Sequence, residues 1–528
     1  MGSDAKPAGL RWINKTRPVF TARKGVKMNL FLKNLDAKPH KGKLSCSITD
    51  YYGKVVAKVT KRVEVGPKST YSFQPEIKLK KKGIFDAQVS FAGTWGEKKA
   101  AIRFTFALLD PLPADANKLD ADSPFGMGIY IGRHHGYYKT AADLAYAIGV
   151  KSTRHEFSWV WVEPSQDDFR LGPSKPVDLA HDRGMHILGM LGYCTDWASA
   201  APKDAKYYRL MAPPKEMADY ADYVYRVVRE YKDKVRYWEI WNEPNQTTFW
   251  HPKPDPKVYA ELCKAGYEAA KKADPDCTVV GGATVWTDLT FIEDVFKHGG
   301  FKYMDAISVH PYRYPLAPDA PYGRYVSGGL RMMLEKMAGV LKGKGGAKAL
   351  SKGELAGLKK KAGLVEQILS GLDRITEQEL TEEQLGAEIS SIEKLMDQDL
   401  KLSSFAKKVP DMRTAFGTVD YLLRKLKRMM RDGLVDKTVA GELVALKKLI
   451  DKYGGGKAIW ISELGWPSNK GPRGISDKLQ AEYLIRMYVT CISVPTVEVV
   501  QWYNFKNDVY DPKWTEANFG IVTVSMRP

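Results

Sequence analysis

Two hydrophobic rhythms divide the chain of 528 residues. In residues 9–109, short runs of alternating apolar and polar residues are separated by turn-forming pairs such as Tyr52-Gly53 and Gly66-Pro67. This spacing predicts short strands and favours an immunoglobulin-like β-sandwich. We expect strands at 27–32, 43–49, 55–63 and 84–91. Residues 109–113 (Leu-Asp-Pro-Leu-Pro) predict a linker, because the residue before a proline favours extended backbone.

From about residue 122, apolar runs rich in β-branched residues alternate with amphipathic stretches. Helices are expected at 215–231, 256–272 and 477–490, among others. Eight such repeats predict an α/β protein, a (β/α)8 barrel of the TIM type. A doubly wound open sheet fits less well, because no glycine-rich phosphate loop follows the first run. The eight strands are expected at 125–131, 152–159, 186–193, 236–242, 278–283, 305–312, 458–463 and 497–505.

A long insertion interrupts this rhythm, since about 145 residues separate the sixth and seventh runs, more than a crossover needs. Two possible capping boxes, Ser351…Glu354 and Thr376…Glu379, predict helices there. The insert follows strand six, so we expect a helical unit at the catalytic mouth, either as a cleft wall or as a contact surface, with an inert insertion as the alternative. Apolar residues at helical spacing support this: Leu358, Leu364, Ile368, Leu372 and Ile375.

Four regions follow from these patterns. They are a basic β-sandwich domain at 1–110, strands one to six of the barrel at 111–320, the helical insert at 321–440, and strands seven and eight at 441–528. The barrel's own sixth helix is expected near 441–453. No eighth helix follows strand eight in the sequence.

Charge is distributed unevenly over these regions. The net charge is +19, of which residues 1–110 carry +15 and residues 321–450 carry +7, while the remainder carries −3. A strongly basic surface attracts nucleic acid, anionic lipid or acidic polysaccharide, although it is also compatible with a merely solvated face. The five cysteines are scattered, so neither a disulfide framework nor a set of metal ligands is predicted. No apolar run of membrane-spanning length occurs.

The chemistry is concentrated at the ends of strands four and seven. Strand four ends in Trp-Glu-Ile-Trp-Asn-Glu-Pro-Asn, with Glu243 as its second acid, and strand seven ends in Trp-Ile-Ser-Glu-Leu-Gly-Trp-Pro, with Glu463. Both acids would lie at the carboxyl ends of barrel strands, where barrel active sites form. Cleavage of a glycosidic bond needs one protonated and one ionised carboxyl group. The pair therefore predicts a glycoside hydrolase.

These motifs closely resemble those of clan A retaining glycoside hydrolases, most of all family 39, which includes β-xylosidases and exopolysaccharide hydrolases. The resemblance covers about residues 122–314 and 445–525. It implies that Glu243 is the acid/base and Glu463 the nucleophile of a double displacement on β-glycosidic bonds.

The resemblance also implies substrate-binding residues around this pair. Asn242 would bind the sugar 2-hydroxyl, and Arg154 at the end of strand two would hold the nucleophile ionised. His310 and Tyr312 follow strand six, where Tyr312 could donate a hydrogen bond to Glu463. Glu239 lies within strand four, so we interpret it as a buried carboxylate that needs a partner such as Arg154.

Aromatic side chains complete the expected sugar site. Trp502 on strand eight would form the floor under the sugar, followed by a cis peptide bond of the kind common in the clan. Trp197, Trp250 and Trp466 follow strands three, four and seven, where their rings could pack on sugar faces. Tyr193 stands at the end of strand three, where some clan members carry a histidine.

No pattern of cofactor or metal ligands competes with this interpretation. The expected partner is a poly- or oligosaccharide, possibly acidic, and no nucleic acid is expected; the oligomeric state is left open. A carbohydrate-binding pseudoenzyme and a transglycosylase are the alternatives. The sequence shows no signal segment. Because such substrates are mostly outside cells, we expect a secreted or periplasmic protein whose signal has been removed, with a cytoplasmic protein as the alternative.

Overall fold

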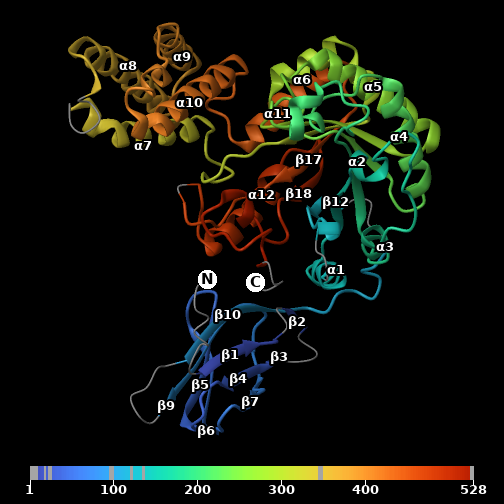
Figure 1. Ribbon diagram of the computed structural model, residues 1–528, viewed down its shortest axis with the longest axis vertical. Coiled ribbons are helices and arrows are strands. Elements are labelled where there is room, and N and C mark those ends of the chain that lie inside the picture. Colours follow the sequence, from blue (N-terminus) through green and yellow to red (C-terminus); the bar gives the residue numbers. More distant parts are fainter. Residues whose placement is uncertain are drawn as a thin grey trace. The chain divides into compact units, whose positions relative to one another are not determined.

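The structure is a computed structural model that describes residues 10–16, 19–21, 26–93, 100–118, 123–133, 137–342, 349–471 and 473–523. The chain divides into two compact units (Figure 1). One comprises residues 1–118, 139–149 and 522–528, and the other comprises residues 119–138 and 150–521. In the part of the chain that is described, no helix is long and apolar enough to cross a membrane.

The first unit is built mainly from β-sheets. Its largest sheet has five strands in the order β2-β10-β9-β5-β6, beside a three-stranded sheet β1-β4-β7 and a two-stranded sheet β3-β8. The strands are β1 (Leu10–Asn14), β2 (Val19–Thr21), β3 (Val26–Lys27), β4 (Leu30–Asn34), β5 (His40–Asp50), β6 (Val55–Val65), β7 (Thr70–Phe73), β8 (Glu76–Ile77), β9 (Gly83–Gly93) and β10 (Ala100–Leu109).

Side-chain alternation explains why these strands stack. Leu44, Cys46 and Ile48 on β5 are fully buried, and they join inward-facing residues of the smaller sheets in one core. On β6, Lys58 and Lys61 face solvent. Sheets packed around one core agree with the predicted β-sandwich, while the immunoglobulin-like topology stays a prediction.

The second unit contains a closed barrel of eight parallel strands, β11 to β18 in chain order. The predicted TIM-type fold is therefore confirmed. All eight strands lie within or close to the expected segments: β11 (Phe125–Met127), β12 (Ser152–Phe157), β13 (His186–Leu191), β14 (Tyr237–Ile240), β15 (Thr278–Val285), β16 (Ala306–His310), β17 (Ala458–Leu464) and β18 (Val497–Trp502).

Helices follow most of these strands, and their burial reflects the amphipathic pattern. On α4 (Met217–Tyr231), for example, Tyr220, Tyr223, Val224 and Val227 form the buried stripe. The described chain after β18 contains the short 3-10 helix η8 (Thr515–Asn518). The other α-helices that the second unit contributes around its strands are α2 (Trp159–Val162), α3 (Lys175–His181), α5 (Pro256–Ala273), α6 (Leu289–Lys297), α11 (Val439–Lys452) and α12 (Asp477–Ile492). Helix α1 (Tyr138–Ala147) lies in the first unit except for its first residue.

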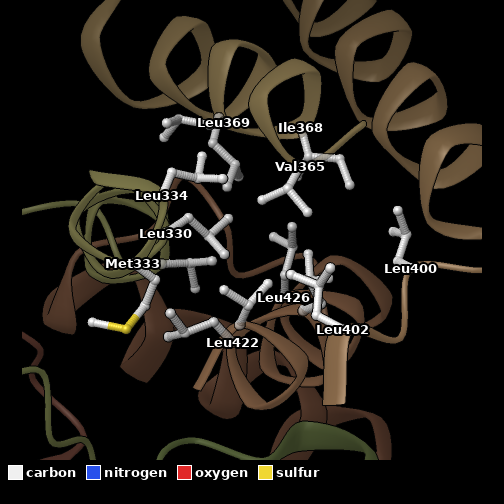
Figure 2. Packing of buried hydrophobic residues seen from close by; sticks show 14 of the residues in the cluster. Leu330, Met333, Leu334, Val365, Ile368, Leu369, Leu400, Leu402, Leu422 and Leu426 are labelled. Carbon is white, nitrogen blue, oxygen red and sulfur yellow. The ribbon is translucent and has the colours of Figure 1, made fainter. Parts of the chain in front are cut away.

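Between β16 and α11 the insert forms four α-helices with their own hydrophobic core. Figure 2 shows leucines of α7 and α10 packed beneath residues of α8. The core includes Leu330, Ile368 and Leu426, which are completely buried. The helices are α7 (Gly323–Leu341), α8 (Lys352–Glu377), α9 (Glu382–Met396) and α10 (Arg413–Arg431).

One of the two predicted capping boxes exists. Ser351 and Glu354 form it at the start of α8. The prediction for Thr376 was wrong, because Thr376 lies near the end of α8 and its hydroxyl donates back to the Leu372 carbonyl at 2.9 Å. The second box starts five residues later, where Thr381 and Gln384 cap α9.

The two ends of the insert meet at its root. The amide of Tyr322 donates to the Lys437 carbonyl at 2.8 Å, and the amide of Gly323 donates to the Val435 carbonyl at 2.7 Å. Beside this root, Arg313 forms a completely buried ion pair with Glu442 at 2.8 Å. The two ends of the insert are therefore joined by hydrogen bonds where they meet the barrel, and α10 also contacts the barrel through the ion pair of Arg428 with Asp288 at 3.2 Å.

Candidate active site

The two predicted catalytic acids lie at the carboxyl ends of β14 and β17. Glu243 follows β14 in a sharp turn, with φ at 47°, a left-handed value that non-glycine residues seldom adopt. Its amide donates to the Ala283 carbonyl at 2.8 Å, which holds the turn against β15. Such backbone costs on the order of 1–3 kcal/mol and is concentrated at functional sites.

The acids face each other closely. Oxygen atoms of Glu243 and Glu463 lie within 4.8 Å of each other and of one ring nitrogen of His310. Glycosidases that retain configuration hold their two carboxyl groups roughly 5 Å apart, whereas inverting enzymes need room for a water between them. The spacing therefore suits direct attack by one carboxylate on the sugar.

Glu463 is surrounded by groups that stabilise its ionised form. The guanidinium of Arg154 forms an ion pair with it. The Tyr130 hydroxyl donates to its Oε1 at 2.7 Å, and the Tyr312 hydroxyl donates to its Oε2 at 3.2 Å. Burial and the charge of Glu463 raise the pKa of Tyr312 well above its usual value, so this phenol keeps its proton.

Arg154 links the nucleophile candidate to the rest of the barrel floor. It is buried, its Nε donates to Glu239 Oε2 at 2.7 Å, and its Nη2 donates to Asn242 Oδ1 at 2.9 Å. Glu239 also accepts a hydrogen bond from the Ser308 hydroxyl at 2.7 Å. The prediction that Glu239 is a buried carboxylate paired with Arg154 is therefore confirmed.

Glu243 has different partners. The Gln246 amide donates to its Oε2 at 2.7 Å, and His310 Nδ1 lies 3.0 Å from its Oε1. The other ring nitrogen of His310 is 2.9 Å from the Ser462 hydroxyl, which fixes the orientation of the ring. Glu243 thus has an amide and an imidazole as neighbours, while Glu463 has a guanidinium.

A cavity of about 560 Å³ opens above these acids. Of the predicted site residues it is lined by Arg154, Asn242, Tyr312 and Tyr193, and the Tyr193 ring stacks on Phe249 with centroids 5.8 Å apart. His310 is fully buried just beneath. The insert adds further lining residues: Tyr325 of α7, and Tyr421 and Lys425 of α10.

Trp502 is not where we expected it. It is completely buried, and its ring stacks on Trp466 at 5.7 Å, away from the cavity lining. The prediction of a cis bond after Trp502 was also wrong, because the cis peptide joins Tyr503 to Asn504. Tyr503 lines the cavity in its place. A strand exposes alternate residues to opposite sides, so a shift of one residue exchanges buried and exposed positions.

Trp197 and Trp250 also lie outside the cavity lining. The Trp197 indole donates to the Glu163 carbonyl at 3.2 Å and packs edge-on against Trp159. Trp250 is buried and packs edge-on against Trp241. Loop tryptophans were expected to face the sugar, but these rings cover the barrel rim, because a large apolar ring gains more from burial.

Sequence reasoning missed several residues of the site, including three outside the insert. Tyr130 contacts Glu463, Gln246 contacts Glu243, and Tyr503 lines the cavity. Position alone was a usable signal for Tyr130, which ends the first predicted strand, and for Gln246, three residues after the acid/base candidate. Neither belongs to a motif that the resemblance singled out.

The same atoms also satisfy a spacing criterion for a metal site, since Glu243, His310 and Glu463 each offer one ligand atom within 4.8 Å. Their surroundings do not suit a cation. The guanidinium of Arg154 already contacts Glu463, and a fixed positive charge there repels a metal ion.

Comparisons with known proteins agree with this geometry. Residues 176–322, which carry β13 to β16 and Glu243, match the family model "Glycosyl hydrolases family 39". Among curated proteins there is no match.

Solved structures also resemble the chain. A family 39 glycoside hydrolase from Bacteroides cellulosilyticus has a TM-score of 0.60 at 17% identity, covering 98% of this chain and 80% of that one. A family 39 β-xylosidase from Caulobacter crescentus has a TM-score of 0.43 at 15% identity (78% and 69% covered), and a family 39 enzyme from Xanthomonas axonopodis pv. citri has 0.42 at 12% (78% and 65%). The match of residues 176–322 confirms the resemblance to family 39 for that part of the barrel, and the structure from Bacteroides cellulosilyticus shows the same fold.

Proposed function

We propose that the protein is a retaining glycoside hydrolase that cleaves β-glycosidic bonds in a poly- or oligosaccharide by double displacement. The single observation that carries this proposal is the pair of carboxylates within 4.8 Å of each other, one beside a guanidinium and the other beside an amide. Glu463 acts as the nucleophile, and Glu243 acts as the acid and then as the base.

In the first step, a Glu463 oxygen attacks the anomeric carbon while protonated Glu243 gives its proton to the leaving oxygen. In the second step, Glu243 takes a proton from water, and the water oxygen displaces Glu463. Arg154, Tyr130 and Tyr312 stabilise the carboxylate that leaves. These donors do not move during the reaction, so no free energy is spent on reorienting them.

Asn242 is placed to bind the sugar 2-hydroxyl. Its Oδ1 accepts from Arg154 at 2.9 Å, which fixes the side-chain amide and turns its NH2 group towards other acceptors. Because hydrogen bonds to the 2-hydroxyl strengthen in the transition state, this contact contributes to rate more than to ground-state binding.

A Glu243→Ala variant tests the two roles together. A leaving group such as nitrophenolate needs no proton, so an activated aryl β-glycoside should still release a burst of phenolate and then stop at the glycosyl-enzyme. The sugar is unknown, so a panel of aryl β-glycosides is screened first with the unchanged enzyme. Mass spectrometry of the peptide that carries Glu463 should then show one added glycosyl group.

Two results would contradict the assignment. A glycosyl group on another peptide would reassign the nucleophile. If Glu243→Ala lowers the rates on natural and activated substrates by the same factor, Glu243 is not the acid/base, because only the natural leaving group needs a proton.

A further inference from the structure

The wall that the insert contributes to the cavity carries a buried cation. Lys425, on α10, is 5% exposed and lines the same cavity as Glu243 and Glu463. Its ammonium lies 3.8 Å from the ring centre of Trp286 and 4.0 Å from that of Tyr325. A third ring, that of Tyr322, is centred 4.8 Å away. The side chain is therefore held in one place by aromatic faces.

The ammonium of Lys425 makes no hydrogen bond or ion pair with the described residues. The carboxylate whose charge acts most on it is Glu442. Both oxygens of Glu442 are already engaged, because one accepts from Arg313 at 2.8 Å and the other from Thr287 at 2.9 Å. The charge of Glu442 is thus compensated by Arg313, and the three donors of Lys425 have no acceptor in the part of the chain that the structure describes.

An unpaired buried ammonium is costly, and aromatic faces offset only part of that cost. Burial accordingly lowers the pKa of Lys425, and the nearby charges of Arg313 and Arg473 lower it further. Packing alone does not explain a lysine here. Its neighbours Leu422 and Leu426 belong to the apolar core of the insert, where methionine or leucine would fit without a penalty.

The surroundings of Lys425 suit an anionic sugar. Arg473, in the loop after β17, lines the same cavity and also has no ion pair among the residues that the structure describes. Tyr421, which lines the same cavity, offers an aromatic face for a sugar ring beside these cations. Four carboxylates also line this cavity, Glu156, Glu243, Glu463 and Glu516, but none of them is among the charges that act most on Lys425. A negative group on the substrate is therefore attracted to Lys425 and repelled from these acids.

We propose that Lys425 is the anion-binding group of a substrate subsite, so that the saccharide cleaved at this site carries an oxyanion, a carboxylate or a sulfate ester, on the sugar bound against the insert. This rests on the proposed function only in taking the cavity as the substrate site. Arg473 adds positive potential to the same wall. The ring of that sugar packs on Tyr421.

Binding to a catalytically inert Glu463→Gln protein tests the proposal independently of turnover. The ligands are uronic-acid polysaccharides with several different backbones, each paired with its carboxyl-reduced neutral form, and sulfated polysaccharides paired with their desulfated forms. Titrations are done at about 0.15 M salt, which screens weak binding to exposed basic surfaces. Lys425→Met is compared with Lys427→Met, which removes the same charge from an exposed position on the same helix.

The account predicts that at least one anionic polysaccharide binds at least about tenfold more tightly than its neutral partner. Lys425→Met should lower the affinity for that anionic polysaccharide by about 10- to 100-fold, which corresponds to the loss of a hydrogen bond to a charged group. Affinity for the neutral form should change by less than about twofold, and Lys427→Met should change neither. The preferred ligand identifies the oxyanion as carboxylate or sulfate.

Three outcomes would overturn the subsite. In the first, no anionic polysaccharide binds more tightly than its neutral form. In the second, Lys425→Met weakens binding of the anionic and the neutral form equally. In the third, Lys425→Met lowers the melting temperature, as expected for a purely structural lysine. The subsite instead predicts an equal or higher melting temperature, because the variant removes an unpaired buried charge. A binding preference without any hydrolysis by the unchanged enzyme would leave the subsite standing and refute the proposed function.

Discussion

The barrel residues that form the floor of the cavity have paired charges, whereas the wall that the insert contributes carries an unpaired one. On the floor, Arg154 is shared by Glu239 and Glu463. On the wall, Lys425 has aromatic faces but no carboxylate within ion-pair distance among the described residues. A paired set of charges is complete before substrate arrives and serves chemistry that is the same for any sugar. The unpaired charge on the wall gains an ionic partner only when a ligand binds. We therefore expect the wall to determine which saccharide is preferred.

The largest effect should come from the floor. Glu463→Ala removes the nucleophile, and kcat on an aryl glycoside should fall by a factor on the order of 10⁴ to 10⁶, as for other nucleophile deletions. Glu498→Gln is the matched control, because this acid lies on β18 near its start, at the opposite end of the barrel. Its kcat should stay within about twofold. Ordinary turnover by Glu463→Ala would refute the mechanism.

A paired charge at the root of the insert should affect stability more than chemistry. Arg313→Met leaves Glu442 buried without its partner, and the free energy of unfolding should fall by about 3–5 kcal/mol. The double variant Arg313→Met, Glu442→Leu removes both charges and should regain much of this loss in chemical denaturation. If the double variant is as unstable as the single one, the loss is due to packing rather than to an unpaired charge.

Removing the insert should distinguish what the wall contributes from what the floor contributes. The hydrogen bonds of Tyr322 to Lys437 and of Gly323 to Val435 show that a short turn can join its two ends. In that variant kcat/KM on a long polysaccharide should fall by about tenfold or more, because the loss of a single contact worth about 1.4 kcal/mol already lowers it tenfold. The value for an aryl monoglycoside should change much less. Equal losses on both substrates would mean that the insert supports the floor itself.

Lys425 should make stability depend on pH. Its pKa is lowered in the folded protein, so the folded state holds this proton less tightly than the unfolded chain, where the pKa is about 10.5. The penalty is fully present below the folded pKa and is relieved as pH rises from there towards 10.5. Lys425→Met should therefore raise the melting temperature over the unchanged protein more at about pH 6 than at about pH 10. A gain that does not depend on pH would show that Lys425 is not buried as a cation.

The smallest effect should come from one neutral donor. Tyr130→Phe removes the 2.7 Å hydrogen bond to Glu463 but leaves Arg154 in place. A loss of about 0.5–1.5 kcal/mol predicts a fall in kcat of roughly 2- to 12-fold. Tyr421→Phe, on the wall, is the control and should leave kcat on a small glycoside unchanged. A loss as large as that of Glu463→Ala would mean that Tyr130 acts in the chemical step.

The sequence predicted what depends on local pattern. The eight barrel strands, the two strand-end acids and the buried Arg154–Glu239 pair all follow from apolar runs and from acids placed at or inside them. Each of these features is set by the hydrophobic pattern of a single strand, so its position can be located directly in the sequence.

Features that depend on tertiary packing were missed. Trp502 and Tyr503 exchange roles through a shift of one residue at the end of β18. Trp197 and Trp250 pack into the rim instead of facing the sugar. Lys425 stands in an ordinary amphipathic helix, and its placement in the cavity depends on how α10 packs on α7 and beside Trp286. No spacing rule in the sequence connects residue 425 with residue 286.

The anomeric configuration of the first product tests the central claim most directly. With a substrate found in the glycoside panel, proton NMR during the first minutes of hydrolysis distinguishes the two anomers before they interconvert. Carboxylates within 4.8 Å predict that the β-configured product appears first, through attack by Glu463 and then by water. An α-configured first product would mean single displacement by water, and would contradict both the nucleophile role of Glu463 and the mechanism built on it.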